Sequence, residues 1–220
     1  MSLNTALIAL FGCLLPLTVL SGQTNQTEAS PSPDKTVAAA SSQHKLHWKN
    51  RAEPYNWKVV SRTRRDDMWI MELAPENAEK EDHSNLLIVQ AFIKPENFSL
   101  EQWSASIILT YQQKCNAIKV DALKNDGAIG YDQRSLFIMC GRKLDEEFGV
   151  YTFLKGIRKD RLFYVILREI QVPPSEIAGA LTVPKGSDPE EVFSGTADAM
   201  RYLFEDVYLC GPDIINPQCQ

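Results

Sequence analysis

The stretch VYTFLKGIRKDRLFYVILREI, residues 150–170, decides the fold of this chain. Two runs of apolar and β-branched residues, 150–157 and 162–170, flank the charged tetrapeptide Arg158-Lys159-Asp160-Arg161. This pattern predicts a β-hairpin, and the apolar run 162–167 predicts a central strand of a sheet. Because strands joined by a hairpin pair antiparallel, the sheet is expected to be mainly antiparallel.

Further strands are predicted on the N-terminal side of this hairpin. Asp66-Asp67 and Asn125-Asp126-Gly127 are turn-forming sequences that separate some of them. The strands share β-branched or alternating apolar residues and are WKVVSRTRR (57–65), MWIMEL (68–73), LLIVQAFI (86–93), NAIKVDAL (116–123) and SLFIMC (135–140).

The clearest local signal is a helix from Leu100 to about Cys115. Ser99 is a good N-cap residue, and Gln102, three positions later, completes a capping box. Apolar residues, among them Trp103, then recur at helical spacing, which predicts one face packed on the sheet.

A second helix is predicted to begin at Pro189, after Asp188 as its N-cap, with an apolar face that extends to Val207. The order of elements is strands, helix, strands, helix, and neighbouring strands are linked by turns. The predicted fold class is therefore α+β, a mainly antiparallel β-sheet packed by two main α-helices.

Residues 1–22 are predicted to be a signal peptide, because the uncharged apolar run Ala6–Leu20 is followed at once by small polar residues. Two alternatives stay open. The segment is a retained membrane anchor, although Pro16 interrupts it, or the chain is a lipoprotein that carries lipid on Cys13. In all three cases the rest of the chain is exported, to the periplasm or out of the cell.

Residues 23–50 are rich in Ser, Thr, Gln, Ala and Pro, which predicts a disordered polar tether, and residues 51–220 are predicted to form a single domain. The chain has 23 Lys and Arg against 28 Asp and Glu, a formal net charge of −5. That balance argues against nucleic acid as a partner, because phosphate binding needs a basic face. Membrane contact is expected only through the N-terminal segment, if it is retained.

With Cys13 inside the signal segment, four cysteines remain, and an even number in an oxidising compartment favours disulfides. Cys210 and Cys219 enclose a short loop with one glycine and two prolines, which suits a local ring. Cys115 ends a predicted helix and Cys140 ends a predicted strand, so a bridge between them would join helix to sheet. Of the three pairings that four cysteines allow, we predict Cys115–Cys140 and Cys210–Cys219.

Several motifs after Phe98 carry a resemblance to known proteins. They are Trp103, Cys115, LFIMC (136–140), YTFLKGIRKDRLFYVILRE (151–169), and MRYLFEDVYLC (200–210) with Cys219. In these motifs the chain resembles a largely uncharacterised family of small exported proteins of proteobacteria. The resemblance supports the same cysteine pairing and a periplasmic location, and it implies no activity. The element order is also similar to the PsbP/Mog1-like fold, a sheet sandwiched by helices, which by itself says little about function.

The sequence offers no convergent set for catalysis, cofactor binding or metal binding. His44 and His47 lie in the predicted tether and His83 in a polar loop, where histidines are usually solvated. Asp145-Glu146-Glu147 is predicted to be a solvated turn, since adjacent carboxylates do not flank a substrate. We therefore predict no catalytic residue, no cofactor and no metal, although an enzyme stays open as an alternative.

The one basic cluster is Arg62, Arg64 and Arg65, a candidate patch for an anionic partner. The leading hypothesis is a non-enzymatic, exported binding or accessory module of the bacterial envelope, of which an inhibitor or immunity protein is one specific form. Its partner would be an unidentified protein or envelope component. The alternatives are a periplasmic hydrolase with carboxylates converging in a pocket, and a small-ligand carrier with an apolar cavity.

Overall fold

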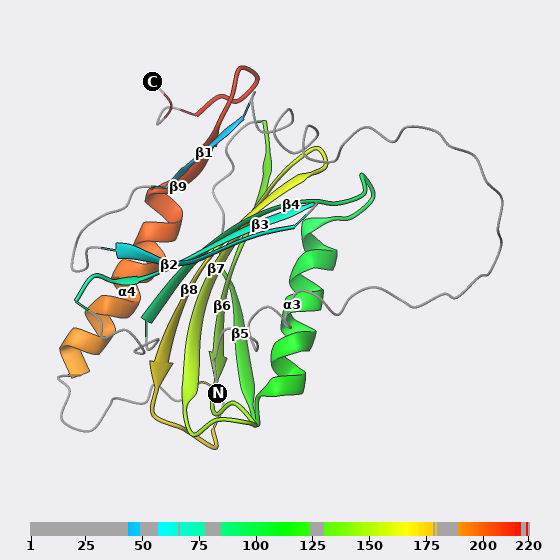
Figure 1. Cartoon of the computed structure of the whole chain (residues 1–220). Coiled ribbons are helices and arrows are strands. Elements are labelled where there is room, and N and C mark those ends of the chain that lie inside the picture. Colours follow the sequence, from blue (N-terminus) through cyan, green and yellow to red (C-terminus); the bar gives the residue numbers. More distant parts are fainter. Residues whose placement is uncertain are drawn as a thin grey trace, which may run out of the picture. The chain divides into compact units, whose positions relative to one another are not determined.

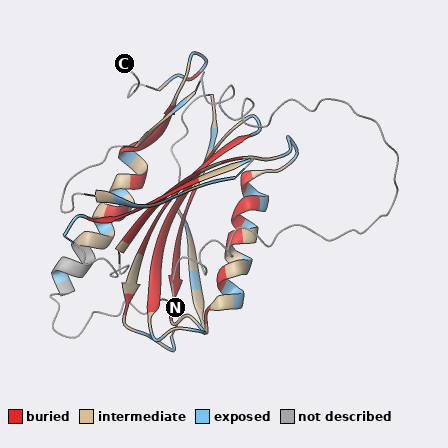
Figure 2. Ribbon diagram, viewed as in Figure 1, coloured by how far each residue is buried: buried red, intermediate tan, exposed pale blue. Residues whose placement is uncertain are grey.

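The hairpin at residues 150–170 lies in the middle of a seven-stranded antiparallel sheet (Figure 1). Its strands are β7 (Gly149–Lys159) and β8 (Leu162–Val172), which pair along their whole length. Asp160 in the turn has a φ of 55°, a left-handed conformation that aspartate tolerates in tight turns. Both strands are buried along most of their length, and Figure 2 shows buried residues concentrated in the middle strands.

The structure is a computed structural model and describes residues 44–48, 57–65, 67–77, 85–123, 130–177, 179, 189–216 and 219. The predicted signal peptide with Cys13, most of the predicted tether, His83 and the turn at 125–127 lie outside the described residues. The strand order in the sheet is β2-β3-β4-β8-β7-β6-β5, so β2 and β5 are the two edge strands. The remaining strands are β2 (Trp57–Arg65), β3 (Met68–Pro75), β4 (Asn85–Ile93), β5 (Ile118–Leu123) and β6 (Asp132–Cys140).

Helix α3 (Leu100–Lys114) covers one face of the sheet over β5, β6 and β7. The predicted capping box is present, because the Ser99 Oγ accepts from the backbone N–H of Gln102 at 3.2 Å and the Gln102 Oε1 accepts from the backbone N–H of Ser99 at 2.8 Å. Trp103 is 2% exposed and lies against Gly156 of β7. A Cβ atom at Gly156 would be 2.7 Å from Trp103 Cζ3, so this approach of helix to strand requires glycine.

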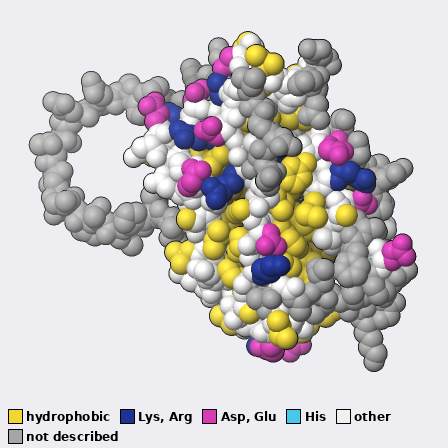
Figure 3. All heavy atoms as spheres, turned by 180° about the vertical axis from the view of Figure 1, so that it is seen from behind, with side chains coloured by type: hydrophobic (Ala, Val, Ile, Leu, Met, Phe, Trp, Pro, Cys, Tyr) yellow, Lys and Arg dark blue, Asp and Glu magenta, His cyan; other side chains and the backbone are white. Residues whose placement is uncertain are grey.

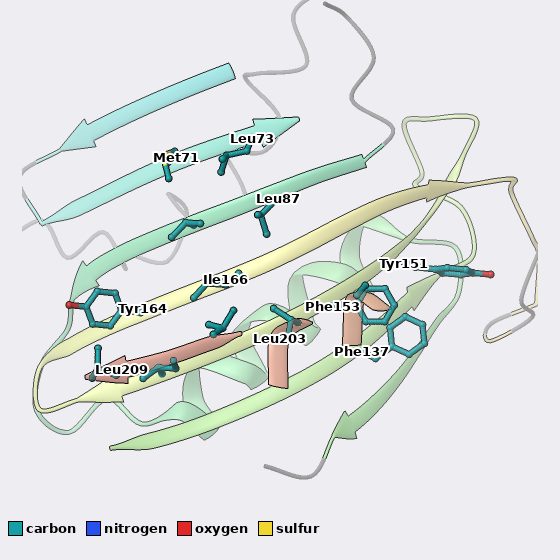
Figure 4. Close-up of a cluster of buried hydrophobic side chains, with 14 of the residues drawn as sticks. Met71, Leu73, Leu87, Phe137, Tyr151, Phe153, Tyr164, Ile166, Leu203 and Leu209 are labelled. Carbon is teal, nitrogen blue, oxygen red and sulfur yellow. The ribbon is translucent and has the colours of Figure 1, made fainter. Parts of the chain in front are cut away.

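Helix α4 (Pro189–Glu205) covers the opposite face, where Leu203 packs among the buried side chains of β7 and its neighbours (Figure 4). The two faces follow from alternation along β7, since Phe153 lies in the cluster beneath α4 whereas Gly156 meets α3. The predicted α+β class, a mainly antiparallel sheet with two helices, is confirmed.

A small second sheet corrects two sequence predictions. β1 (Lys45–Trp48) pairs antiparallel with β9 (Val207–Cys210), with Lys45 opposite Cys210. The prediction of a disordered tether is therefore wrong for residues 45–48. The sequence predicts that the second helix extends to Val207, but the helix ends at Glu205, because Val207 belongs to β9. A strand of four residues is too short to show an alternating pattern in the sequence. In addition, β1 and β9 come from opposite ends of the domain's sequence, so no local turn signals their pairing.

Both predicted disulfides are present. Cys115–Cys140 joins the end of α3 to the end of β6, with a Cα–Cα distance of 5.6 Å. Cys210–Cys219 closes the C-terminal loop after β9, with a Cα–Cα distance of 5.7 Å. Both distances are in the usual range for disulfides.

Candidate functional site

The predicted basic cluster lies on β2, an edge strand of the seven-stranded sheet (Figure 1). Residues 57–65 contain Lys58, Arg62, Arg64 and Arg65 and no acidic residue, although the whole chain has a formal net charge of −5. The three arginines are exposed and Lys58 is half-buried. We call these four residues, with the backbone of β2, the basic edge.

The pairing of β2 with β3 places the arginines on two faces of the sheet. Arg62 is opposite Met71 and Arg64 is opposite Trp69, and both partners belong to the α4-side face. Arg65 is opposite Met68, one position out of phase, so its side chain stands on the other face. The structure therefore brings Arg62 and Arg64 together on one face and separates Arg65 from them.

The backbone of the basic edge is the second feature of the site. β2 pairs with β3 on one side, and no strand among the described residues pairs with its other side. In an antiparallel pair every second residue directs its N–H and C=O away from the neighbour, so an edge strand presents a row of hydrogen-bonding groups. The register shifts between Val59 and Ser61, and the adjacent Val59 and Val60 are 41% and 42% exposed.

The charges elsewhere are mixed. On the face shown in Figure 3, Lys and Arg side chains lie beside Asp and Glu side chains, and hydrophobic side chains reach the surface between them. On β5, the opposite edge strand, Lys119 forms an ion pair with Asp121 at 3.5 Å. The Asp145-Glu146-Glu147 segment lies in the turn before β7, with Asp145 and Glu147 exposed, as the sequence predicts.

A buried polar cluster, which no sequence pattern predicts, lies between the end of α3 and the sheet. Glu169 of β8 accepts a bond from the Lys143 Nζ at 2.7 Å and from the Tyr111 hydroxyl at 3.3 Å. The Tyr111 hydroxyl also bonds to the Thr152 Oγ1 at 2.8 Å. Burial, together with the Glu169 charge, raises the pKa of Tyr111 well above its usual value. The Glu169 carboxylate is paired with Lys143, and its side chain is 8% exposed. Its bond from Tyr111 of α3 holds the helix against the sheet, so we assign Glu169 a structural role.

Lys155 of β7 is a second buried charge that was not among the sequence predictions. It is 3% exposed, and its Nζ donates to the Leu203 carbonyl at 2.9 Å and the Val207 carbonyl at 2.6 Å. The Leu203 carbonyl is among the last of α4, where helix carbonyls lack partners within the helix. Burial lowers the pKa of Lys155 to about 8. The only sequence signal for this role is a lysine inside an otherwise apolar run.

The histidines of the predicted tether also differ from expectation. His44 bonds through its Nε2 to the Asp213 Oδ1 at 2.7 Å, and His47 stacks on Tyr208 with ring centroids 5.4 Å apart. Lys159 is 2.5 Å from the other oxygen of Asp213. Two hydrogen bonds hold the pKa of Asp213 well below its usual range, and the bond with Lys159 has a larger effect than the bond with His44. The His44 contact joins residues 44–48 to the C-terminal loop, and the His47 contact joins them to β9.

Neither a ligand pocket of ordinary size nor a metal site stands out in the described part of the chain. A shallow depression that is partly open to solvent, with a volume of about 180 Å³, lies beside Cys140, Tyr151 and Ile177. Sites for small ligands usually measure roughly 300–1,000 Å³. Within the described residues there is no metal-binding group of three or more His, Cys, Asp or Glu side chains, and no helix with the length and apolar character needed to cross a membrane.

No protein-family model matches the chain, and a search of curated proteins finds no match. The family resemblance and the PsbP/Mog1-like similarity therefore stay predictions from the sequence. The basic edge is the candidate functional site on the geometry alone.

Proposed function

We propose that the protein is a non-enzymatic binding module that works in an exported, oxidising compartment of the bacterial envelope and holds an anionic protein partner. The observation that carries the proposal is the basic edge, where four cations and no acid lie on one exposed strand of an acidic chain. Charges of one sign on a surface steer an oppositely charged partner and select its orientation.

The compartment is supported by Cys115–Cys140 and Cys210–Cys219, because disulfides persist in oxidising environments and are rare in the cytosol. Both disulfides lie outside β2. One joins the end of α3 to the end of β6, and the other closes the loop after β9. A braced sheet with an open edge suits a module that presents a preformed surface to a partner.

The alternatives have weaker support. A carboxylate-based hydrolase needs an acid that reaches substrate, whereas Glu169, the most buried glutamate among the described residues, is paired with Lys143. A small-ligand carrier needs a cavity, whereas the depression beside Cys140 and Tyr151 has a volume of about 180 Å³ and is partly open to solvent. Neither has an observation in its favour comparable to the basic edge.

The test is affinity capture from native envelope extract with the intact, disulfide-bonded protein as bait. The double variant Arg62→Glu with Arg64→Glu reverses the charges that share one face. Lys119→Glu on β5 is the matched control, since it makes the same kind of change on the opposite edge strand. We expect a partner that the wild type and the control retain and the double variant loses. Equal recovery with all three baits, or with none, would refute the proposal.

A further inference from the structure

We propose that the partner of the basic edge binds as an added β-strand, an extended segment with acidic residues on one of its faces. This inference rests on the proposed function and specifies its partner, since an anionic surface could also be held by side-chain contacts alone. Strand addition makes use of the open backbone of β2 as well as its charge.

The positions of the side chains define which strand fits. Residues on an added strand lie on the same face as the β2 residues opposite them. Acidic residues that alternate along the partner would therefore meet Arg62 and Arg64, which share the α4-side face. The other face of β2 offers Ser61 and Thr63, which suit small or β-branched partner residues, and Arg65 at the end of the strand. Val59 and Val60 add exposed apolar surface at the start of the same stretch.

The same charges argue against a second copy of this chain as the occupant. Pairing of two β2 strands would bring the cations of one copy next to those of the other, with no acid on either strand to offset them. Like charges on neighbouring strands are unfavourable, and cations on an edge strand oppose self-association in this way. A strand that carries acidic residues would instead be attracted to these cations. The basic edge therefore favours an acidic partner over a second copy of this chain.

The test uses synthetic peptides and the intact, oxidised protein. The probe is a short peptide of alternating Glu and Val, which places all its carboxylates on one face when extended. Its first control has the same composition with the Glu residues in adjacent pairs, so that the charges fall on both faces. Its second control is the alternating peptide with N-methylated backbone amides, which keeps every charge and removes the donors of a strand ladder.

We expect the alternating peptide to bind more tightly than either control, by about tenfold or more, because the controls lose charge matching or several backbone hydrogen bonds. Arg62→Glu with Arg64→Glu should weaken binding of the alternating peptide by a similar factor, and Lys119→Glu should leave it unchanged. Sedimentation of the protein alone should show a monomer.

Three results would overturn the inference. They are no binding of the alternating peptide, equal binding of the N-methylated peptide, and a dimer that β2 substitutions dissociate. If the N-methylated peptide binds equally while envelope capture still depends on Arg62 and Arg64, strand addition is wrong and the proposed function stands. If capture is indifferent to these charges, the proposed function fails.

Discussion

Lys155 is expected to make the domain more stable as the pH rises into the alkaline range. A lysine that gains an acidic partner on folding has the opposite effect. Burial lowers the pKa of Lys155 from 10.5 in the unfolded chain to about 8 in the fold. Between these two values the unfolded state binds more protons than the folded state, so the free energy of unfolding rises with pH. Below about pH 8 both states hold the proton, and the full penalty of the buried charge is present.

The size of the effect follows from the shift. One pKa unit corresponds to about 1.4 kcal/mol, so the deprotonation of Lys155 should raise the free energy of unfolding by about 2–3 kcal/mol between about pH 7 and pH 10. Lys155→Met keeps an unbranched apolar side chain and removes the titrating ammonium. The difference in the free energy of unfolding, wild type minus variant, should therefore increase by that amount over this range.

The assay is urea unfolding followed by tryptophan fluorescence at several pH values and constant ionic strength. Lys159→Met is the control on the same strand. The hydrogen bond that Lys159 donates to the Asp213 carboxylate raises the pKa of Lys159, so its contribution to stability is fully present below pH 10.5 and is lost only above it. A wild-type-minus-variant difference for Lys155→Met that stays constant from pH 7 to 10 would refute the reasoning.

Two further predictions concern the packing of the domain. Replacing both cysteines of Cys115–Cys140 by serine should lower the free energy of unfolding by about 3.5 kcal/mol, against about 2.5 kcal/mol for Cys210–Cys219, because the sequence separations are 25 and 9. Urea unfolding of the two variants measures both losses, and the reverse order would contradict the loop argument. Gly156→Ala should cost about 1–3 kcal/mol, because the new methyl group would be 2.7 Å from Trp103 Cζ3. The loss should shrink when Trp103→Leu is also present, and an unchanged loss would show that the two residues are not in contact.

Local signals in the sequence predict most of the main sheet and both helices. The capping box at Ser99 and Gln102 works within one helical turn, so the sequence alone locates the start of α3. The hairpin of β7 and β8 likewise needs only two apolar runs and a charged turn between them. Each of these elements carries its own evidence along the chain.

Features made by long-range contacts could not be predicted in the same way. β1 depends on its pairing with β9, in which Lys45 lies opposite Cys210, a residue 165 positions later in the chain. Neither strand has enough residues to display alternation. Val207 continues the apolar spacing of α4, which is why the helix seemed to extend through it. The partners of Glu169 and Lys155 come from other elements, so the sequence did not reveal these buried charges.

The candidate site was half predictable. The sequence shows a cluster of three arginines, Arg62, Arg64 and Arg65. Only the strand order and the register show where in the sheet the cluster lies and which face each side chain is on. The order places β2 at an edge, and the register puts Arg62 and Arg64 on one face and Arg65 on the other. The structure therefore adds to the charge cluster an open strand backbone and two faces that carry different side chains.

Hydrogen exchange of the intact protein, alone and with the partner that it captures, shows directly whether the partner adds a strand to β2. The outward-facing amides of an edge strand exchange quickly when the strand is unpaired and slowly once another strand is added. The account predicts that partner binding slows exchange within residues 57–65 and leaves β5, the opposite edge strand, unchanged. Slowed exchange on α4 or β5 with none on β2 would contradict it.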